Sequence, residues 1–292
     1  MNQKPICLIT GATSGIGEVT ARELARRGMH VIIVGRSAER VAATVARIKQ
    51  ATGVDVETLI ADLSSQAGVR SVAETFLQRY QRLDVLINNA GGFFASRQVS
   101  ADGIELTWAL NHMSYFLLTN LLTDILRASA PARVVNVSSD AHRSGVMRWD
   151  DLQFTRSYNG WAAYAQSKLA NILFSNELAR RLEGTGVTSN ALHPGFVATR
   201  FAHNNGIIWG GLMALMQRLF GITPEEGAQT SIYLATASEV ATISGRYFVK
   251  SRETSPAPQA QDMAAAARLW EITERMIINS APVLRGDAHS PA

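Results

Sequence analysis

Short apolar runs alternate with longer segments of helical periodicity along most of this chain. The apolar runs have the length of buried strands and are expected at residues 6–10, 30–34, 56–61, 83–87, 133–137, 187–192 and 245–249. Helices are expected between them, at residues 18–27, 37–50, 64–79, 104–126, 161–182, 224–235 and 259–278. This alternation predicts an α/β fold, a doubly wound parallel sheet (Rossmann fold) of about seven strands with helices on both faces.

No linker and no internal repeat interrupts this pattern before its last residues. We therefore expect residues 1–279 to form a single domain for dinucleotide binding and catalysis. The last stretch, APVLRGDAHSPA, lacks periodicity, so residues 280–292 are expected to form a disordered tail.

The first strand leads directly into a turn rich in glycine, and a helix follows at once. A strand, a glycine turn and a helix together present backbone N–H groups and a helix N-terminus to a pyrophosphate. The spacing is G-x-x-x-G-x-G, which differs from the G-x-G-x-x-G fingerprint, so an ordinary turn with three glycines is an equal alternative. The candidate cofactor-binding residues of this turn are Gly11, Thr13, Ser14, Gly15, Ile16 and Gly17.

The ends of the second and third strands carry further cofactor candidates. Gly35 stands where the dinucleotide pattern expects an acid, and Arg36 follows it with a planar cation suited to a 2′-phosphate. We therefore expect NADP(H) to be preferred over NAD(H), with an ordinary exposed arginine as the alternative. Asp62, beside Leu63, is a candidate partner of the adenine amino group or a cap of the next helix.

Tyr164 and Lys168 are spaced by one helical turn, so both side chains project from one face of the expected helix. A phenol beside an ammonium group is a tunable acid, and we expect Lys168 to lower the pKa of Tyr164. The alternative is a surface lysine that follows a packed tyrosine.

Composition limits the other classes of function. With 47% hydrophobic and 18% charged residues, the 292-residue chain can build a large core. Its formal charge is +4 and its basic residues are scattered, so no nucleic acid partner is expected. Cys7 is the only cysteine, which excludes an intrachain disulfide. No apolar stretch approaches the ~20 residues of a membrane helix, so we expect a soluble, cytoplasmic protein without stable membrane insertion.

Three motifs in register carry a family resemblance. TGATSGIG at 10–17, NNAG at 88–91 and YAQSK at 164–168 resemble the short-chain dehydrogenase/reductase family over residues 6–249. Longer stretches, such as SKLANILFSNELARRL at 167–182, resemble its retinol dehydrogenase and WW-domain oxidoreductase branch. The chain contains no G-x-S-x-G, so a serine hydrolase is not expected.

The resemblance implies a catalytic set of Asn111, Ser139, Tyr164 and Lys168, with Ser138 as the alternate serine. The serine would hydrogen-bond the substrate oxygen, and the Asn111 carbonyl would help to hold a water next to Lys168. Lys168 would also bind the nicotinamide ribose. The further cofactor contacts that the resemblance implies are Asn88, Ala90, Gly91, Pro194, Gly195, Val197 and Thr199. No second histidine or cysteine stands at metal spacing from His193, so no metal is expected.

The resemblance also implies the reaction, which is hydride transfer between NADP(H) and a carbonyl/alcohol pair. Apolar residues dominate 200–222, where the family places a substrate lid, so we expect a mainly apolar small molecule. Core packing or a patch that touches a membrane is the alternative for this segment. A catalytically silent nucleotide sensor or scaffold is the alternative for the whole chain.

Two features stay open at this stage. Ser139 and Tyr164 are separated by 25 residues, about twice the usual gap in the family, so residues 142–161 form an extra segment. Four large apolar or aromatic side chains of this segment are expected either to line the substrate pocket or to form an oligomer contact: Met147, Trp149, Phe154 and Tyr158. Family members commonly pair through the helices that contain Asn111 and Tyr164, so a homo-oligomer is possible.

Overall fold

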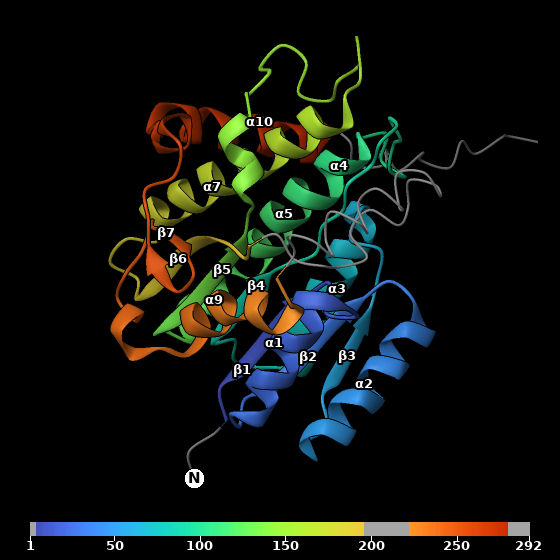
Figure 1. The fold of residues 1–292 in the computed structure, drawn as a ribbon, viewed down its shortest axis with the longest axis vertical. Helices are drawn as coiled ribbons and strands as arrows, with labels where there is room; N and C mark the ends of the chain where they lie inside the picture. The colour runs from blue at the N-terminus through green and yellow to red at the C-terminus, as the bar shows by residue number, and fades with distance from the viewer. Residues whose placement is uncertain (1–3, 196–221, 280–292) are drawn as a thin grey trace, which may run out of the picture.

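Eight strands form one sheet in the order β3-β2-β1-β4-β5-β6-β7-β8 (Figure 1). The computed structural model describes residues 4–195 and 222–279. The strands are β1 (Ile6–Thr10), β2 (His30–Gly35), β3 (Glu57–Ile60), β4 (Val85–Asn88), β5 (Ala132–Val137), β6 (Val187–His193), β7 (Tyr247–Val249) and β8 (Arg252–Glu253). All neighbouring strands pair in parallel except β7 and β8. The winding reverses between β1 and β4, and sheets of this kind bind ligands at the carboxyl ends of such strands.

Helices cover both faces of the sheet (Figure 1). Helices α1, α2 and α9 pack on one face with strand residues such as Ile9, whereas α3, α5 and α7 pack on the other with residues such as Leu8. The α-helices are α1 (Gly15–Arg26), α2 (Ala38–Thr52), α3 (Gln66–Arg79), α4 (Leu106–Trp108), α5 (Ser114–Leu121), α6 (Thr123–Ala128), α7 (Gly160–Arg181), α9 (Pro224–Thr236) and α10 (Met263–Asn279). Shorter turns are the π-helix η1 (Ala109–Met113) and the 3₁₀ helices η2 (Asp140–Ser144), η4 (Ser238–Val240) and η5 (Pro258–Gln261).

The predicted doubly wound α/β fold is confirmed, and each of the seven predicted strands is present within two residues of its expected bounds. The prediction missed β8, which has only two residues and therefore shows no alternation of apolar and polar positions. The turn before it uses Lys250 and Ser251 at φ of 51° and 57°, where glycine or asparagine is the usual signal of a hairpin.

The prediction of one regular helix over residues 104–126 is wrong. The chain forms α4, then the π-helix η1, then α5 and α6, with a break at Leu122. The wider turn of η1 contains Asn111, whose side-chain amide bonds both the N–H and the carbonyl of Gly92. Such π-turns inside helices are often found at functional sites.

Helix α10 packs against α5 and α7 (Figure 1). The ring of Trp270 lies 4.7 Å from the ring of Phe116 and is stacked 5.8 Å from that of Phe174. These are the helices through which pairing was expected, so α10 covers part of the surface that pairing would use. A homo-oligomer stays a prediction.

Two expected features, most of the lid at 200–222 and the tail at 280–292, lie outside the described residues. Within the described ranges, no helix has both the length and the apolar character needed to cross a membrane.

Candidate active site

A cavity of about 690 Å³ opens at the carboxyl ends of the parallel strands. The predicted residues that line it are Gly11, Thr13, Ser14, Ile16, Gly17, Arg36, Asp62, Leu63, Ala90, Gly91, Ser138, Ser139, Tyr164, Lys168, Pro194 and Gly195. Its described lining does not include Gly15, Asn88 or Asn111. A larger hollow of about 1020 Å³ lies beside β7 and is lined by none of the predicted residues, so chemistry and not size identifies the site.

Two glycines bring the turn after β1 against the turn after β4. Gly11 has a φ of 66°, and a Cβ at this position would lie 2.7 Å from Ala90 Cα. A Cβ on Gly17 would lie 2.5 Å from Asn89 Nδ2. Ser14 stands at the N-cap of α1 but makes no capping hydrogen bond through its side chain. The N-terminus of α1 therefore keeps backbone donors for an anion, which fits the pyrophosphate of a dinucleotide.

Asn89, which was not predicted, connects the two turns. Its Nδ2 donates to the carbonyl of Thr10 at 2.8 Å, and its backbone N–H donates to Thr10 Oγ1 at 2.9 Å. The predicted Asn88 is instead fully buried in the sheet, where Nδ2 donates to Thr119 and Asn136 at 2.9 Å each. Because Asn88 faces the protein interior, it can support the sheet, while Asn89 lines the cavity.

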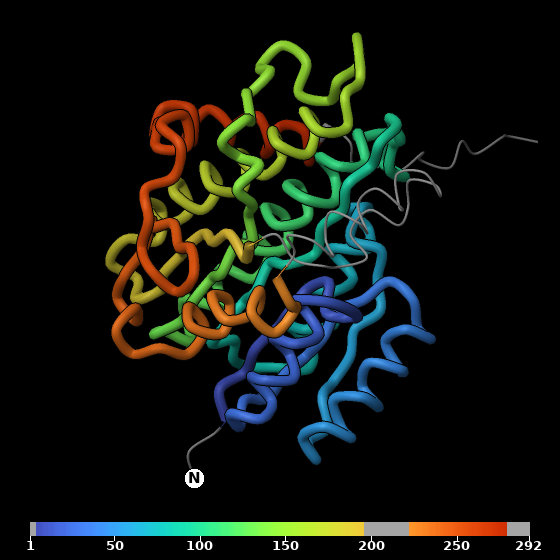
Figure 2. Tube along the Cα trace, viewed as in Figure 1, coloured from blue at the N-terminus to red at the C-terminus, as the bar shows by residue number. Residues whose placement is uncertain are grey.

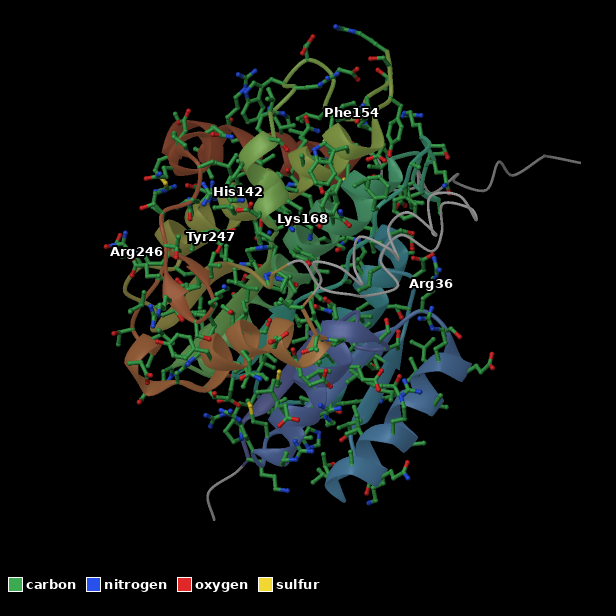
Figure 3. The ribbon with its side chains drawn as sticks, viewed as in Figure 1. Arg36, His142, Phe154, Lys168, Arg246 and Tyr247 are labelled. Carbon is green, nitrogen blue, oxygen red and sulfur yellow. The ribbon has the colours of Figure 1, made fainter. Side chains whose placement is uncertain are left out.

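The far end of the cavity carries two exposed arginines. Arg36 follows β2 (Figure 3), and Arg40, which was not predicted, projects from the first turn of α2. Among the described residues, no carboxylate pairs with either guanidinium. Asp62 also lines this end, but its Oδ1 accepts from the backbone and hydroxyl of Ser64, and Ser65 is the N-cap of α3. The capping alternative for Asp62 is therefore wrong.

The two serines after β5 have different environments. Ser138 is buried, and its hydroxyl donates to the carbonyl of Lys168 at 2.7 Å. Ser139 lies near enough to Tyr164 to act on the pKa of its phenol, and its Oγ accepts from the backbone N–H of Ala141 at 3.2 Å. The structure thus brings Ser139, the preferred candidate, to the tyrosine.

Tyr164 is buried on the first turns of α7 and has a perturbed acidity. Burial raises the pKa of Tyr164 to about 12, although the side chain of Ser139 acts in the opposite direction. The prediction that Lys168 lowers the pKa of Tyr164 is therefore wrong for the protein alone. The cost of removing the phenolate from water exceeds the help of its neighbours, because both side chains are buried.

Lys168 lies one turn further along α7, near the centre of the molecule (Figure 3). Burial lowers the pKa of Lys168 to about 7, and its Nζ donates to the carbonyl of Val137 at 3.1 Å. Nζ lies 5.7 Å from the centroid of the Tyr164 ring. A Cβ on Gly91 would lie 3.5 Å from Nζ and 3.2 Å from Asn111 Oδ1, so Asn111 and Lys168 flank the same turn.

Apolar side chains that were not predicted surround Tyr164. The aromatic rings of Phe93 and Trp161 each lie 6.1 Å from the ring of Tyr164. The apolar side chains that line the cavity near this point are Phe94, Leu106, Leu110 and Trp161. Helical spacing could have found Trp161, which is one turn before Tyr164, and Leu106 with Leu110, which are one turn apart.

Apart from Trp161 at its end, which lines the cavity, the extra segment 142–161 reaches it only indirectly in the described structure. Met147 and Trp149 pack against the core, and Phe154 is buried at a φ of 49°. The hydroxyl of Tyr158 donates to the carbonyl of Phe94 at 2.9 Å. None of these four side chains is among the described lining residues, so the segment supports the wall from behind.

The turn after β6 is described only in part. Pro194 and Gly195 line the cavity, which agrees with their expected place near the cofactor. Val197 and Thr199 lie outside the described residues.

A doubly wound sheet, a glycine turn at its switch point and a Ser-Tyr-Lys group at one cavity define an oxidoreductase of the nicotinamide-dependent class. The family model of the short chain dehydrogenases matches residues 5–206, and the chain belongs to this family. The chain is 43% identical over 288 residues to human retinol dehydrogenase 13, which covers 95% of this chain and 86% of the relative. It is 46% identical over 286 residues to human retinol dehydrogenase 14, covering 92% and 85%.

Solved structures give the same result for the fold. An uncharacterized protein from Mycobacterium paratuberculosis superposes with a TM-score of 0.76 at 33% identity and covers 93% of this chain and 92% of its own. The RhlG/NADP active-site complex of Pseudomonas aeruginosa superposes with a TM-score of 0.68 at 32% identity, covering 84% and 93%.

Proposed function

We propose that this protein is an NADP(H)-dependent oxidoreductase that interconverts a carbonyl group and an alcohol on a mainly apolar small molecule. The observation that carries the proposal is the group of Ser139, Tyr164 and Lys168, which line one cavity together with apolar side chains. Relatives named retinol dehydrogenases, whose names specify an apolar alcohol, support the substrate class.

Each catalytic residue has a separate role in the proposed reduction. Tyr164 keeps its proton at neutral pH, because burial raises its pKa to about 12, and donates it to the substrate oxygen. Ser139 donates a hydrogen bond to the same oxygen, where negative charge develops. Lys168, with a pKa of about 7, can hold or release a proton beside Tyr164 in the neutral range. Trp161 and Leu110 exclude water from the apolar part of the substrate.

The chain's residues also fit the cofactor. The turn at Gly11 and Gly17 and the donors at the N-terminus of α1 would hold the pyrophosphate. Arg36 and Arg40 would hold a 2′-phosphate, and Lys168 would bind the ribose. When bound, the nicotinamide supplies or accepts the hydride.

The cofactor preference is tested by parallel fluorescence titrations with NADPH and NADH. We expect NADPH to bind at least tenfold more tightly, a difference of about 1.4 kcal/mol. Arg36→Ala combined with Arg40→Ala removes two cations from the phosphate site, so it should abolish this preference and leave the NADH affinity unchanged. The matched control is Arg47→Ala, because Arg47 lies on the same helix but pairs with Glu18 at 2.7 Å.

Three outcomes separate the alternatives. Equal affinities of the wild type for both cofactors would contradict the proposed preference. Binding of neither cofactor would favour the silent scaffold. Consumption of NADPH in the presence of nonanal or retinal would establish turnover on an apolar carbonyl compound.

A further inference from the structure

A buried histidine holds the backbone of Ser139. His142 is fully buried, and its Nδ1 lies 2.7 Å from the carbonyl oxygen of Ser139. On the other side of the ring, Nε2 lies 3.1 Å from the backbone nitrogen of Ala257, which donates to it. A carbonyl can only accept and a backbone N–H can only donate. The neutral ring of His142 must therefore carry its proton on Nδ1.

The ring of His142 contacts the backbone of the residue that carries the serine hydroxyl. Ser139 is the N-cap of η2, and its Oγ accepts from the N–H of Ala141. Because the oxygen is already held by this donor, the hydroxyl proton is available for Tyr164 or for a substrate. His142 lies in the same short helix, and its ring bonds back to the carbonyl of the N-cap residue Ser139, so the ring ties the N-cap to the helix.

Residues 254–261, here named the C-terminal strap, present Ala257 to this histidine. The strap connects β8 to α10 and runs beside η2 and α7 (Figure 2). Gln259 Nε2 donates to the carbonyl of Arg143 at 3.1 Å, and Asn176 Nδ2 donates to that of Ala260 at 2.9 Å. The strap is thus attached to η2 and to α7, so the donor at Ala257 has a fixed position.

Two more rings surround the serine turn. The ring of Tyr247 lies 5.1 Å from that of His142, on the side of the molecule away from Arg36 (Figure 3). His193 Nδ1 accepts from the backbone N–H of Asp140 at 3.0 Å. His193 must therefore carry its proton on Nε2 when neutral, which is the opposite tautomer from that of His142.

We infer that His142 is a positioning residue for the proposed reaction, because its Nδ1-protonated ring connects the C-terminal strap to Ser139 and sets where the serine hydroxyl meets the substrate oxygen. A hydrogen-bond path runs from Ala257 through His142 to Ser139, whose side chain acts on Tyr164. A proton on Nε2 would face the N–H of Ala257 and break this path. The inference rests on the proposed function of Ser139 and extends the site to the C-terminal part of the chain.

The tautomer is measured first, because this measurement does not depend on activity. In protein labelled with ¹⁵N at histidine, ring nitrogen shifts distinguish protonated from unprotonated positions. We expect Nδ1–H at His142 and Nε2–H at His193, with the signals assigned by their loss in His142→Phe and His193→Phe. An Nε2–H tautomer at His142 would overturn the inference.

The second measurement is reduction of nonanal by NADPH. His142→Phe keeps a buried ring but loses both hydrogen bonds, so kcat should fall at least tenfold while KM for nonanal and Kd for NADPH stay within threefold. His142→Asn retains a donor near the position of Nδ1 and should recover part of kcat. Gln259→Ala, at an exposed position of the strap, should lower kcat by two- to fivefold without changing KM.

Thr273→Val is the matched control. Thr273 Oγ1 lies 2.9 Å from His112 Nε2, so the variant loses a buried hydrogen bond that attaches α10 without touching the strap or Ser139. Its kcat should equal that of the wild type. A folded His142→Phe protein with the kcat of the wild type would overturn the inference. If the wild type itself shows no turnover, the proposed function fails, and the tautomer measurement still decides whether the hydrogen-bond path exists.

Discussion

Replacement of Tyr164 by phenylalanine should lower the turnover of a carbonyl substrate by about 10³-fold, within the range of 10² to 10⁴ that a positioned general acid supplies. The variant loses the phenol hydroxyl that would donate the proton beside Ser139. The phenylalanine ring keeps the contacts with Phe93 and Trp161, so the fold should persist. Steady-state reduction of nonanal and NADPH titration measure the two effects, and the Kd for NADPH should change less than threefold.

Tyr115→Phe is the matched control for this loss. Tyr115 is also buried and its ring lies 5.9 Å from Lys168 Nζ, but it does not line the described cavity. Its hydroxyl donates to the carbonyl of Val137 at 3.4 Å, a long bond whose removal should leave kcat within a few-fold of the wild type. Turnover of Tyr164→Phe within tenfold of the wild type would show that another group donates the proton.

The fold was predictable because its signals are local. The central strands β1, β2, β4 and β5 are buried on both faces and read as largely apolar runs, and glycine or polar residues follow them, whereas the edge strand β3 is half exposed. Such signals fail for β8, which is too short, and for the π-turn at Asn111, which depends on a partner 19 residues away at Gly92. A contact between residues far apart in the sequence does not produce a periodic pattern of apolar and polar positions.

The chemistry of the site was predictable to the extent that motif spacing fixes it. The spacing brought Ser139, Tyr164 and Lys168 to one cavity. Trp161 lies one helical turn before Tyr164, and Arg40 lies one turn after Ser37, the N-cap of α2 that follows Arg36. Helical periodicity applied from these residues would therefore have found both. The lining role of Asn89 in place of Asn88 depends on which side of the strand end each side chain takes, which the motif alone does not fix.

The direction of the pKa shifts was not predictable, because desolvation depends on burial. The sequence places an ammonium group one turn from a phenol, and in water this pair would lower the pKa of the phenol. In the folded chain both Tyr164 and Lys168 are buried, so each is shifted toward its neutral form. The protein alone therefore holds a protonated acid beside a weakly basic lysine, an arrangement suited to proton donation.

Replacement of Lys168 by methionine should lower turnover by at least 10²-fold and should raise thermal stability in a pH-dependent way. Burial lowers the pKa of Lys168 from its ordinary value of 10.5 to about 7. Below pH 7 the lysine is charged in the folded and unfolded states, and the folded state bears the full cost of burying that charge. Between these two pKa values the unfolded chain binds more protons, so the free energy of unfolding of the wild type rises with pH.

Methionine has a similar length and carries no charge, so it removes this cost at every pH. We expect the variant to melt several °C above the wild type at pH 6, since each pKa unit corresponds to about 1.4 kcal/mol. The difference should shrink as the pH rises above 7 and should be smallest near pH 10, because the lysine of the unfolded chain then also begins to lose its proton and little cost of deprotonation remains on folding. Melting curves of both proteins between pH 6 and pH 10, without added cofactor, measure it. A gain that is the same at both ends of this range would mean that the charge of Lys168 is not desolvated, and the proposed proton-holding role in the neutral range would fail with it.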